Sequence, residues 1–382
     1  MDLDLDAATI AFRDEVRAWL RDNVDHAPRE SYDTATGFEQ HCAWERRLAD
    51  ARLSVVSWPF EFGGRDASLL QWVIFEEEYF AAGAPPRVSA NGINMLGPTL
   101  FSHGTDEQRR RVLPRMASGE QIWAQAWSEP EAGSDIAALR STATRTDGGW
   151  LLNGQKTWSS RAAFADAAFG LFRSDRDSER HKGLIYVMFD LHADGVQLRP
   201  IRQLDGETGF AEIFLDNVFV PDTDVIGEPG AGWRVAMTTA NNERGLSLRS
   251  PGRFLKAADR LVELWRDPAN TADLADTALS ARVADAWISA RAYQLYTFGT
   301  VSRLERGAEL GPESSVNKLF WSALDIDLHE TALDILGSAA ELHSGWLDGY
   351  LFALAGPIYG GTDQIQRNIV AERLLGLPRG NQ

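Results

Sequence analysis

Apolar residues recur at helical spacing over roughly the first 120 residues of this 382-residue chain. Two stripes of this kind are formed by Phe12, Val16, Trp19 and Leu20 and by Trp72, Phe75, Tyr79 and Phe80. Because an α-helix turns once in about 3.6 residues, the members of each stripe share one helix face. Thr105 can cap a further helix, which we expect Pro114 to interrupt. The pattern predicts an all-α domain over residues 1–120, with loops at 58–64 and 83–86.

The pattern changes between residues 121 and 230, where short runs of β-forming residues alternate with turn residues. The strand candidates are residues 150–152, 183–189, 196–201 and 212–220. These runs predict a compact β domain. The glycines of residues 227–232 form a GxxGxG segment, which follows no βαβ pattern and does not match the dinucleotide fingerprint. We interpret that segment as an interdomain turn.

Helical spacing returns from Trp233 to the end of the chain. Long helical stretches are predicted over residues 255–265, 283–304, 316–336 and 365–375. Such helices joined by short loops are typical of an antiparallel bundle. The predicted fold class is therefore α+β multidomain, with a helical domain over 1–120, a β domain over 121–230 and a four-helix bundle over 231–382.

Composition and charge exclude several classes of protein. With 44% hydrophobic and 24% charged residues, the chain is typical of a globular protein, and its one cysteine, Cys42, excludes an internal disulfide. No Cys/His set has zinc-ligand spacing, so we expect no metal. A formal net charge of −17 argues against nucleic acid or an anionic membrane as a partner. The acidic N-terminus and the lack of a long apolar run favour a cytoplasmic protein.

Hydrolytic chemistry has little support in the sequence. There is no GxSxG segment, and the seven histidines are dispersed, with none in a HExxH segment. Three other segments attract attention because they occur in order over about 240 residues. They read QAWSEPEAGSD at 125–135, NGQKTWSS at 153–160 and IYGGTDQIQRN at 358–368.

These three segments resemble the flavin-lining segments and the C-terminal signature of acyl-CoA dehydrogenases. The resemblance extends to residues 58–64, 97–100 and 366–378 and so covers nearly the whole chain. It is strongest toward actinobacterial members of the family, including those that act on steroid-derived thioesters. The resemblance implies an FAD-dependent enzyme built from the three domains predicted above.

The resemblance also implies roles for individual residues. The isoalloxazine ring is expected to contact Trp127, Ser128, Trp158 and Ser160. Ser134 is expected to face the CoA arm, and Thr362 and Gln364 to bind the flavin dinucleotide, in many members from a neighbouring subunit. An apolar wall with hydrogen-bond donors nearby is what a flavin requires, because negative charge accumulates on N5 and the pyrimidine oxygens during reduction.

The catalytic base is the most informative departure. Most family members carry a glutamate where this chain has Gly360, but the isovaleryl and long-chain enzymes carry it at a position that matches Glu243. We therefore predict Glu243 as the base that removes the α-proton, with a pKa raised by burial, and the backbone N–H of Gly360 as a donor to the thioester carbonyl. Arg244 and Tyr359 are assigned to substrate binding. A glycine at 360 also leaves room for branched or bulky acyl groups.

The segment expected to hold the flavin pyrophosphate departs from the family as well. No Arg-x-x-Phe motif is apparent after residue 265, and Asp334 and Ser338 stand where glutamine and glycine are common. Arg282 is a substitute for the missing arginine, although a solvated helix residue is the simpler interpretation.

The predicted function is α,β-dehydrogenation of an acyl-CoA thioester by a homodimer or tetramer that passes electrons to an electron-transferring flavoprotein. An acyl-carrier-protein substrate and a flavin monooxygenase reaction on the same fold stay open. A third alternative is a non-catalytic subunit of a heteromeric dehydrogenase. The weak pyrophosphate match favours this alternative, and the presence of Glu243 opposes it.

Overall fold

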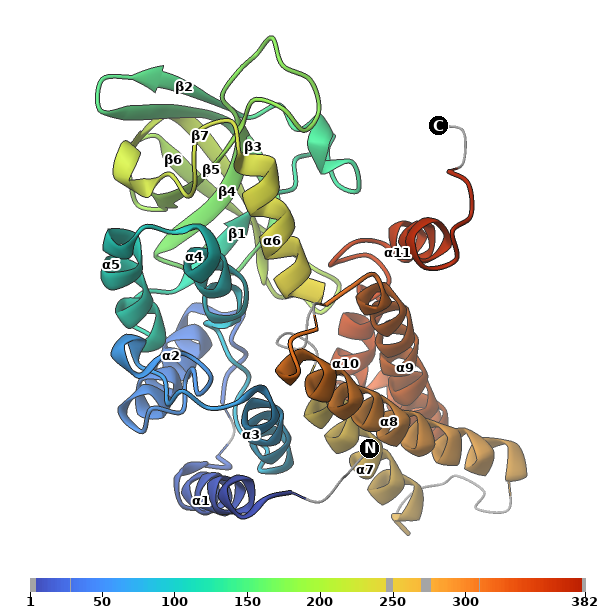
Figure 1. Cartoon of the computed structure of the whole chain (residues 1–382). Helices are drawn as coiled ribbons and strands as arrows, with labels where there is room; N and C mark the ends of the chain where they lie inside the picture. The colour runs from blue at the N-terminus through green and yellow to red at the C-terminus, as the bar shows by residue number, and fades with distance from the viewer. Residues whose placement is uncertain (1–4, 28, 245–249, 269–275, 309, 380–382) are drawn as a thin grey trace. The chain divides into compact units, whose positions relative to one another are not determined.

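The chain forms two compact units, which are described separately here (Figure 1). The structure is a computed structural model that describes residues 5–27, 29–244, 250–268, 276–308 and 310–379; for residues 242–244 it describes the backbone only. The sheet unit consists of Ala27–Ala67 and Pro85–Glu243. The bundle unit consists of Met1–His26, Ser68–Ala84 and Arg244–Gln382.

One seven-stranded mixed sheet organises the sheet unit. Its strands are β1 (Trp123–Ala126), β2 (Thr142–Thr146), β3 (Gly149–Ser160), β4 (Ala167–Arg173), β5 (Leu184–Asp190), β6 (Val196–Ile201) and β7 (Phe210–Pro221). The strand order is β1-β4-β2-β3-β7-β6, and β5 also pairs with β4. β4 and β5 are almost wholly buried, which explains their near-continuous apolar sequences. The runs predicted at 183–189, 196–201 and 212–220 fall on β5, β6 and β7, whereas β1, β2 and β4 were not predicted.

Helices and single turns of helix complete the sheet unit. They are α2 (Ala35–Asp50), η1 (Phe60–Phe62), the π-helical turn η2 (Gly92–Leu96), α4 (Gly97–His103), α5 (Asp106–Ala117), η3 (Ile136–Ala138), η4 (Asp222–Asp224) and α6 (Gly232–Arg244). The start of α6 is pressed against β5, because a Cβ on Gly232 would lie 2.7 Å from the backbone of Ile185. The predicted turn at 227–232 therefore leads directly into α6.

The expectation that Pro114 interrupts a helix is wrong. Thr105 caps α5 as expected, and it forms a capping box with Gln108. The helix then continues through Pro114 to Ala117. Pro114 lies in the last turn, so its missing N–H removes one hydrogen bond, while the N–H of Ser118 still donates to the Pro114 carbonyl at 3.0 Å.

The bundle unit combines helices from both ends of the chain. They are α1 (Ala7–Asn23), α3 (Leu69–Ala81), α7 (Pro251–Arg266), α8 (Thr277–Glu305), α9 (Glu313–Leu336), η6 (Gly337–Glu341), α10 (Gly345–Ala353), α11 (Asp363–Ile369) and the π-helical turn η7 (Val370–Leu374). Figure 1 shows α7, α8 and α9 packed side by side. α3 lies close on α7, because a Cβ on Gly252 would come within 2.8 Å of the Glu76 carbonyl oxygen.

The bundle core is aromatic, with one buried polar cluster. The Phe254 ring stacks on Trp321 at 6.4 Å and meets the edge of Tyr293 at 5.5 Å. Beside these rings, Arg253 donates to the buried carboxylate of Asp325 at 2.6 Å, and His329 Nδ1 lies 2.8 Å from the Asp325 carbonyl oxygen. Burial lowers the pKa of His329, so the ring is neutral at pH 7.

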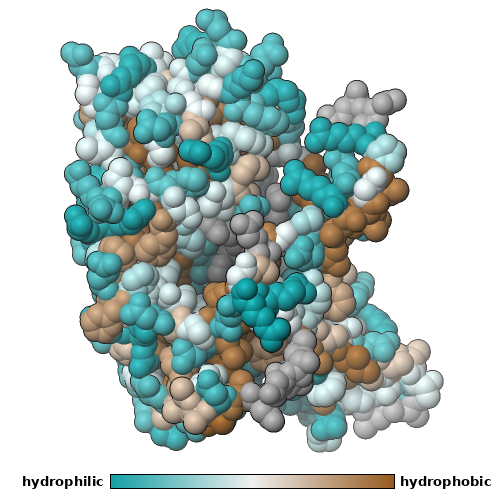
Figure 2. Space-filling view, viewed as in Figure 1, coloured by the Kyte–Doolittle hydropathy of each residue, from teal (hydrophilic) through white to brown (hydrophobic). Residues whose placement is uncertain are grey.

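Part of the bundle surface remains apolar. Figure 2 shows brown surface on the segment after α11, where Leu374, Leu375 and Leu377 are exposed by 42%, 66% and 52%. Exposed apolar side chains that lie close together mark interaction surfaces more often than scattered ones do. None of the helices in the described ranges has the length and apolar character that crossing a membrane requires.

A substitution at Gly349 measures how tightly α10 packs on α9. A Cβ at this position would lie 2.3 Å from His329 Nε2, and the Asp325 carbonyl holds that ring in place. We expect Gly349→Ala to lower the free energy of unfolding by about 1–3 kcal/mol through overpacking, measured by urea denaturation. Gly345→Ala is the control on the same helix, because a Cβ there approaches only Arg260, at 3.9 Å. Equal stability of the two variants would contradict the tight contact.

Candidate functional site

The two flavin-like segments of the sheet unit lie next to each other. Trp127 and Ser128 follow the end of β1, and Trp158 and Ser160 belong to β3. The segments are joined directly, because the N–H of Thr157 donates to the Ser128 carbonyl at 2.8 Å. The fold thus brings together the segments of all four residues that the resemblance assigned to the isoalloxazine ring, although the two segments are about 30 residues apart in sequence.

Trp158 has an unusual backbone. It has a φ of 57°, the left-handed region that bulky residues rarely adopt, and it lies in an irregular part of β3 where the register with β7 shifts between Lys156 and Ser159. The side chain is 59% exposed, and its ring meets the edge of Phe210 at 5.9 Å. Strain and an exposed aromatic ring together are expected of a ligand-binding position.

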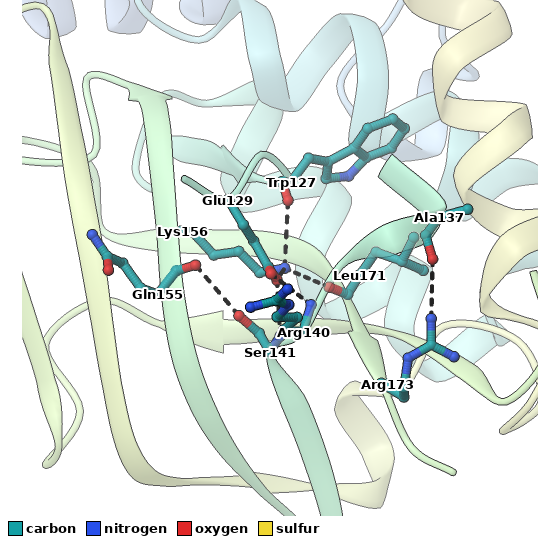
Figure 3. Close-up of polar contacts among 9 residues, drawn as sticks. All are labelled: Trp127, Glu129, Ala137, Arg140, Ser141, Gln155, Lys156, Leu171 and Arg173. Atoms are coloured by element: carbon teal, nitrogen blue, oxygen red, sulfur yellow. Dashed lines mark hydrogen bonds and ion pairs between the residues drawn. The ribbon is translucent and has the colours of Figure 1, made fainter. Parts of the chain in front are cut away.

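A buried ion pair lies beneath these segments (Figure 3). Lys156 is completely buried, and its Nζ donates to Glu129 Oε1 at 2.8 Å and to the Leu171 carbonyl at 2.7 Å. The Trp127 carbonyl oxygen lies 3.4 Å from the same nitrogen. The ammonium group therefore has acceptors on β4, on the segment after β1 and on its own partner Glu129.

Glu129 extends the same network to β2. Its Oε2 accepts from the N–H of Arg140 at 2.6 Å and its Oε1 accepts from the N–H of Ser141 at 3.0 Å. Burial alone would raise the pKa of Glu129, but the charge of Lys156 and these hydrogen bonds outweigh it and hold the pKa below its usual value. The carboxylate is therefore ionised at neutral pH. Burial lowers the pKa of Lys156, and Glu129 opposes that shift.

Ser134 lies on an exposed segment that β4 and the loop after it hold in place. Figure 3 shows Arg173 of β4 pointing to the Ala137 carbonyl, at 3.1 Å. Arg180 of the following loop forms an ion pair of 3.1 Å with Asp135. Ser134 itself is exposed, as a residue that contacts the CoA arm would have to be.

The C-terminal signature forms a tight loop in the bundle unit. Gly360 and Gly361 have φ values of 64° and 84°, a conformation that suits glycine and strains other residues. The buried side chain of Gln366 donates from Nε2 to the Gly360 carbonyl at 3.0 Å. Thr362 caps α11, and Lys318 of α9 forms an ion pair of 2.7 Å with Asp363 at the start of that helix. The loop is therefore fixed on both sides.

The other predicted residues of the bundle unit lie in or beside this loop. Tyr359 stacks on Trp321 at 5.8 Å, and Gln364 is exposed on the first turn of α11. Arg282 of α8 forms an ion pair with Asp334, the residue that stands where glutamine is common. This exposed pairing agrees with the interpretation of Arg282 as a solvated helix residue, since its charge already has a partner.

Glu243 and Arg244 occupy the last turn of α6. Their side chains lie outside the described residues, so the structure gives only their backbone positions. The sequence alone indicates no role for Lys156 and Glu129, although both lie within the quoted segments. The signal was a lysine inside the segment 153–160, which the resemblance makes a strand that backs the flavin, because a cation in such a strand is either exposed or paired. No group of three metal-ligating side chains occurs among the described residues.

The sheet unit fits a flavin on its own features. It presents an exposed, strained tryptophan on the same strand as Ser160, and that strand is hydrogen-bonded to the backbone of Ser128. The buried ion pair of Lys156 and Glu129 joins the two segments. An aromatic wall of this kind packs against a ring, and the hydroxyl groups can donate to its polar edge.

The comparisons with known proteins agree with this arrangement. Three family models match in order: "Acyl-CoA dehydrogenase, N-terminal domain" over residues 7–120, "middle domain" over 124–218 and "C-terminal domain" over 230–375. The chain belongs to the acyl-CoA dehydrogenase family of FAD flavoproteins. It is therefore an oxidoreductase that dehydrogenates acyl-CoA thioesters, and its helical, β and helical architecture is confirmed.

Among its relatives is "Acyl-CoA dehydrogenase IpdE1" of Mycobacterium tuberculosis, 40% identical over 96% of this chain and 97% of that protein. The protein of the same name from Mycolicibacterium smegmatis is 39% identical, with the same coverage. Among solved structures, the "Tcur3481-Tcur3483 steroid ACAD" has a TM-score of 0.89 and 26% identity, with full coverage of both chains. The "ChsE4-ChsE5 complex from Mycobacterium tuberculosis" has a TM-score of 0.87 and 26% identity, also with full coverage of both chains. The predicted resemblance to actinobacterial members of the family is thus confirmed.

The buried ion pair gives a prediction for stability. We expect Glu129→Gln to lower the free energy of unfolding by about 3–5 kcal/mol, because it leaves the Lys156 charge buried without a counter-ion. The pKa of Lys156 then falls further, while in the unfolded chain it stays near about 10.4. The unfolded state therefore binds more protons, so the deficit relative to wild type shrinks as the pH rises from about 7 to 9.5.

Urea denaturation at the two pH values measures this deficit. Glu131→Gln is the matched control: Glu131 also forms an ion pair, with Arg140 at 2.6 Å, but both side chains are more than two-thirds exposed. Its effect is expected to stay below about 1 kcal/mol at either pH. A deficit of Glu129→Gln that is small, or that grows with pH, would contradict the buried pairing.

Proposed function

We propose that the chain uses Glu243 as the base in α,β-dehydrogenation of an acyl-CoA thioester. The observation that carries this proposal is that the chain has no carboxylate at position 360, where most family members have one, and has a carboxylate at position 243. The usual base position is Gly360, whose φ of 64° belongs to a loop fixed by Gln366 and by the Lys318–Asp363 pair. Glu243 lies in the last turn of α6, and the sequence resemblance matches it to the alternative base position of the isovaleryl and long-chain enzymes. A base on α6 leaves the loop free of a strained glutamate.

In this mechanism the protein supplies a base and a donor. Glu243 takes the proton from Cα of the thioester. The N–H of Gly360 stabilises the enolate by donating to the thioester carbonyl, and within the described residues that N–H makes no other hydrogen bond. FAD, when bound, supplies the hydride acceptor for the Cβ hydrogen. Trp127, Ser128, Trp158 and Ser160 would hold its ring, and Thr362 and Gln364 its dinucleotide arm.

We propose a bulky, steroid-derived acyl group bound to CoA as the substrate. Two supports are independent of each other: the glycine at 360 removes side-chain volume near Cα and Cβ, and a solved structure at 26% identity is titled a steroid ACAD. Ser134, Arg244 and Tyr359 are the residues proposed to contact the substrate.

The substrate is tested by anaerobic titration of the flavin with isovaleryl-CoA, palmitoyl-CoA and the CoA thioester of a steroid-derived carboxylic acid. Bleaching of the oxidised flavin band by the steroid-derived thioester alone is the expected result. Equal bleaching by palmitoyl-CoA would overturn the proposed substrate class. Bleaching by a carrier-protein thioester only, or rapid reaction of the reduced flavin with oxygen, would favour the two alternative reactions.

We further propose that the chain works as one subunit of a heteromer in the cytoplasm and delivers its electrons to an electron-transferring flavoprotein. The related structures named above are titled as pairs of different proteins. Arg282, the substitute for the missing pyrophosphate arginine, is already paired with Asp334. The exposed Leu374, Leu375 and Leu377 provide apolar surface for a partner. A second chain would then supply the missing pyrophosphate contact.

The heteromer makes a prediction about cofactor content. Purified alone, the chain is expected to contain less than about 0.2 FAD per chain, and co-purification with its partner subunit to raise this toward saturation of a shared site. The visible absorption spectrum at matched protein concentration measures the difference. One FAD per chain in the isolated protein would show that no second kind of subunit is needed, and would favour the homo-oligomer.

The base assignment makes a separate prediction. Glu243→Gln is expected to retain FAD and to bind the thioester, while the rate of flavin reduction by substrate falls at least about 1,000-fold, within the range of effects for a general base. Stopped-flow reduction under anaerobic conditions measures that rate. Glu228→Gln, an exposed carboxylate just before α6, is the control and should reduce normally. Near-normal reduction in Glu243→Gln would remove Glu243 from the mechanism.

A further inference from the structure

A continuous chain of buried hydrogen bonds crosses the sheet unit. The indole Nε1 of Trp127 donates to Tyr186 Oη at 3.1 Å, and that hydroxyl donates to Thr239 Oγ1 at 3.1 Å. Thr239 Oγ1 lies 2.8 Å from Thr99 Oγ1, which in turn donates to the Met95 carbonyl at 2.8 Å. Tyr186, Thr239 and Thr99 are completely buried. We call these three residues the hydroxyl chain.

The ends of the hydroxyl chain fix its direction. An indole N–H can only donate, and a carbonyl oxygen can only accept. Thr99 gives its proton to Met95, so Thr239 donates to Thr99, and Tyr186 donates to Thr239. A donated bond from Thr239 to the Val235 carbonyl, at 3.3 Å, is longer. Each hydroxyl group therefore accepts one bond and donates one, and aligned bonds of this kind strengthen one another.

The hydroxyl chain fixes the position of α6 along its own axis relative to β5 and α4. Tyr186 lies on β5, Thr239 on α6 and Thr99 on α4. A second contact lies beside it, because His103 Nε2 of α4 is 2.8 Å from Thr238 Oγ1 of α6. A slide or rotation of α6 would break both contacts. α6 is thus held in one register against the strand that also contacts Trp127.

The hydrogen bonds from Trp127 to Thr239 join two parts of the proposed site, the flavin-like segment and the helix that carries the base. Trp127 precedes Ser128 in the flavin-like segment, and Figure 3 shows its carbonyl pointing to Lys156 while its indole points away. Thr239 precedes Glu243 by four residues, which is about one turn of α6. The indole is therefore coupled, through the hydroxyl groups of Tyr186 and Thr239, to the helix that carries the base, and Thr99 links that helix onward to α4.

We propose that Tyr186, Thr239 and Thr99 are positioning residues for the dehydrogenation. They set the distance and angle between the flavin wall at Trp127 and the turn of α6 that bears Glu243. This inference rests on the proposed roles of Glu243 and Trp127. Proton abstraction and hydride transfer need the base and the acceptor on opposite faces of one Cα–Cβ bond, so an error in their separation lowers the rate directly.

Stability alone does not account for the hydroxyl chain. Replacing hydrogen-bonded partners by apolar groups of the same shape is nearly neutral for stability, and phenylalanine and valine have those shapes. A variant with apolar groups in place of the hydroxyl groups would lose the directional contacts. Apolar contacts tolerate small slides and rotations of α6, whereas a row of hydrogen bonds does not. The distinguishing measurement is therefore a rate in the folded holoenzyme.

The test uses Tyr186→Phe, Thr239→Val and the conservative Thr239→Ser in the FAD-loaded holoenzyme, together with its partner subunit if FAD loading requires one. Flavin reduction is followed anaerobically with saturating thioester, using whichever of the three CoA thioesters reduces wild type fastest. Tyr186→Phe and Thr239→Val are expected to slow reduction about 10-fold to 100-fold with less than about 3-fold change in thioester affinity, the scale of a displacement near 1 Å. Thr239→Ser keeps the hydroxyl group and is expected to stay within about 2-fold of wild type, on the same scale.

The matched control is Thr297→Val in the bundle unit. Thr297 is also a buried helix threonine, 1% exposed, and its hydroxyl donates to the Tyr293 carbonyl four residues earlier, at 2.9 Å. Its loss removes the same kind of hydrogen bond and is expected to leave the reduction rate unchanged. The visible circular dichroism of the bound flavin is expected to change in Tyr186→Phe, which alters the indole contact, and not in Thr297→Val.

The outcomes separate this inference from the assignment of the base. Rates in Tyr186→Phe and Thr239→Val within about 2-fold of wild type, well short of the displacement scale, would overturn the positioning role, as would equal slowing in Thr297→Val. Rates that multiply in the double variant would also contradict a single chain, because breaking a second link should add little. If Glu243→Gln reduces normally while Tyr186→Phe is slow, the base assignment fails and the positioning of Trp127 stands.

Discussion

The buried ion pair of Lys156 and Glu129 is the constraint on which the flavin-like surface depends. An ammonium group without access to water must have its hydrogen bonds satisfied by the protein, and those of Lys156 go to Glu129, to β4 and to the segment after β1. Glu129 is in turn held by two backbone N–H groups at the start of β2. Each of these bonds requires a particular register, so the pair specifies how four pieces of backbone meet. The strained Trp158 stands two residues from Lys156 and relies on that support.

Each unit fixes the segment that resembles a ligand-binding motif, and the two units do so with different side chains. In the sheet unit the Lys156–Glu129 pair fixes the backbone after β1, and the hydroxyl chain fixes the indole of Trp127. In the bundle unit the glycine loop at 360–361 is held by the amide of Gln366 and by the Lys318–Asp363 pair. In both units an ion pair formed within the protein supports the segment that the resemblance assigns to a ligand. In the proposed function, such support means that the donors and apolar groups of each segment do not need to rearrange when a ligand binds.

Much of this organisation could be predicted from the sequence. The helical stripes and four of the strands followed from spacing, the family followed from the resemblance of three motifs, and Thr105 caps its helix as its residue type suggested. The sequence could not show β4, because its small residues, alanine and glycine, pack between other strands and have no strong β-propensity. It could not show that Pro114 is tolerated, since that depends on its place in the last turn. The partners of Lys156 and Tyr186 were also hidden, because they come from segments distant in the chain.

The hydroxyl chain restricts which amino-acid substitutions this protein can accept. Because its bonds run in one direction from an indole to a carbonyl, four positions from different parts of the sequence, 99, 127, 186 and 239, act as one functional unit. Loss of one hydroxyl group leaves a buried donor or acceptor on each side unpaired, so a tolerated change at one position calls for a second change at its neighbour. These positions are therefore expected to be exchanged in sets during divergence. Transplanting Trp127 alone into a relative would bring a donor without its acceptor.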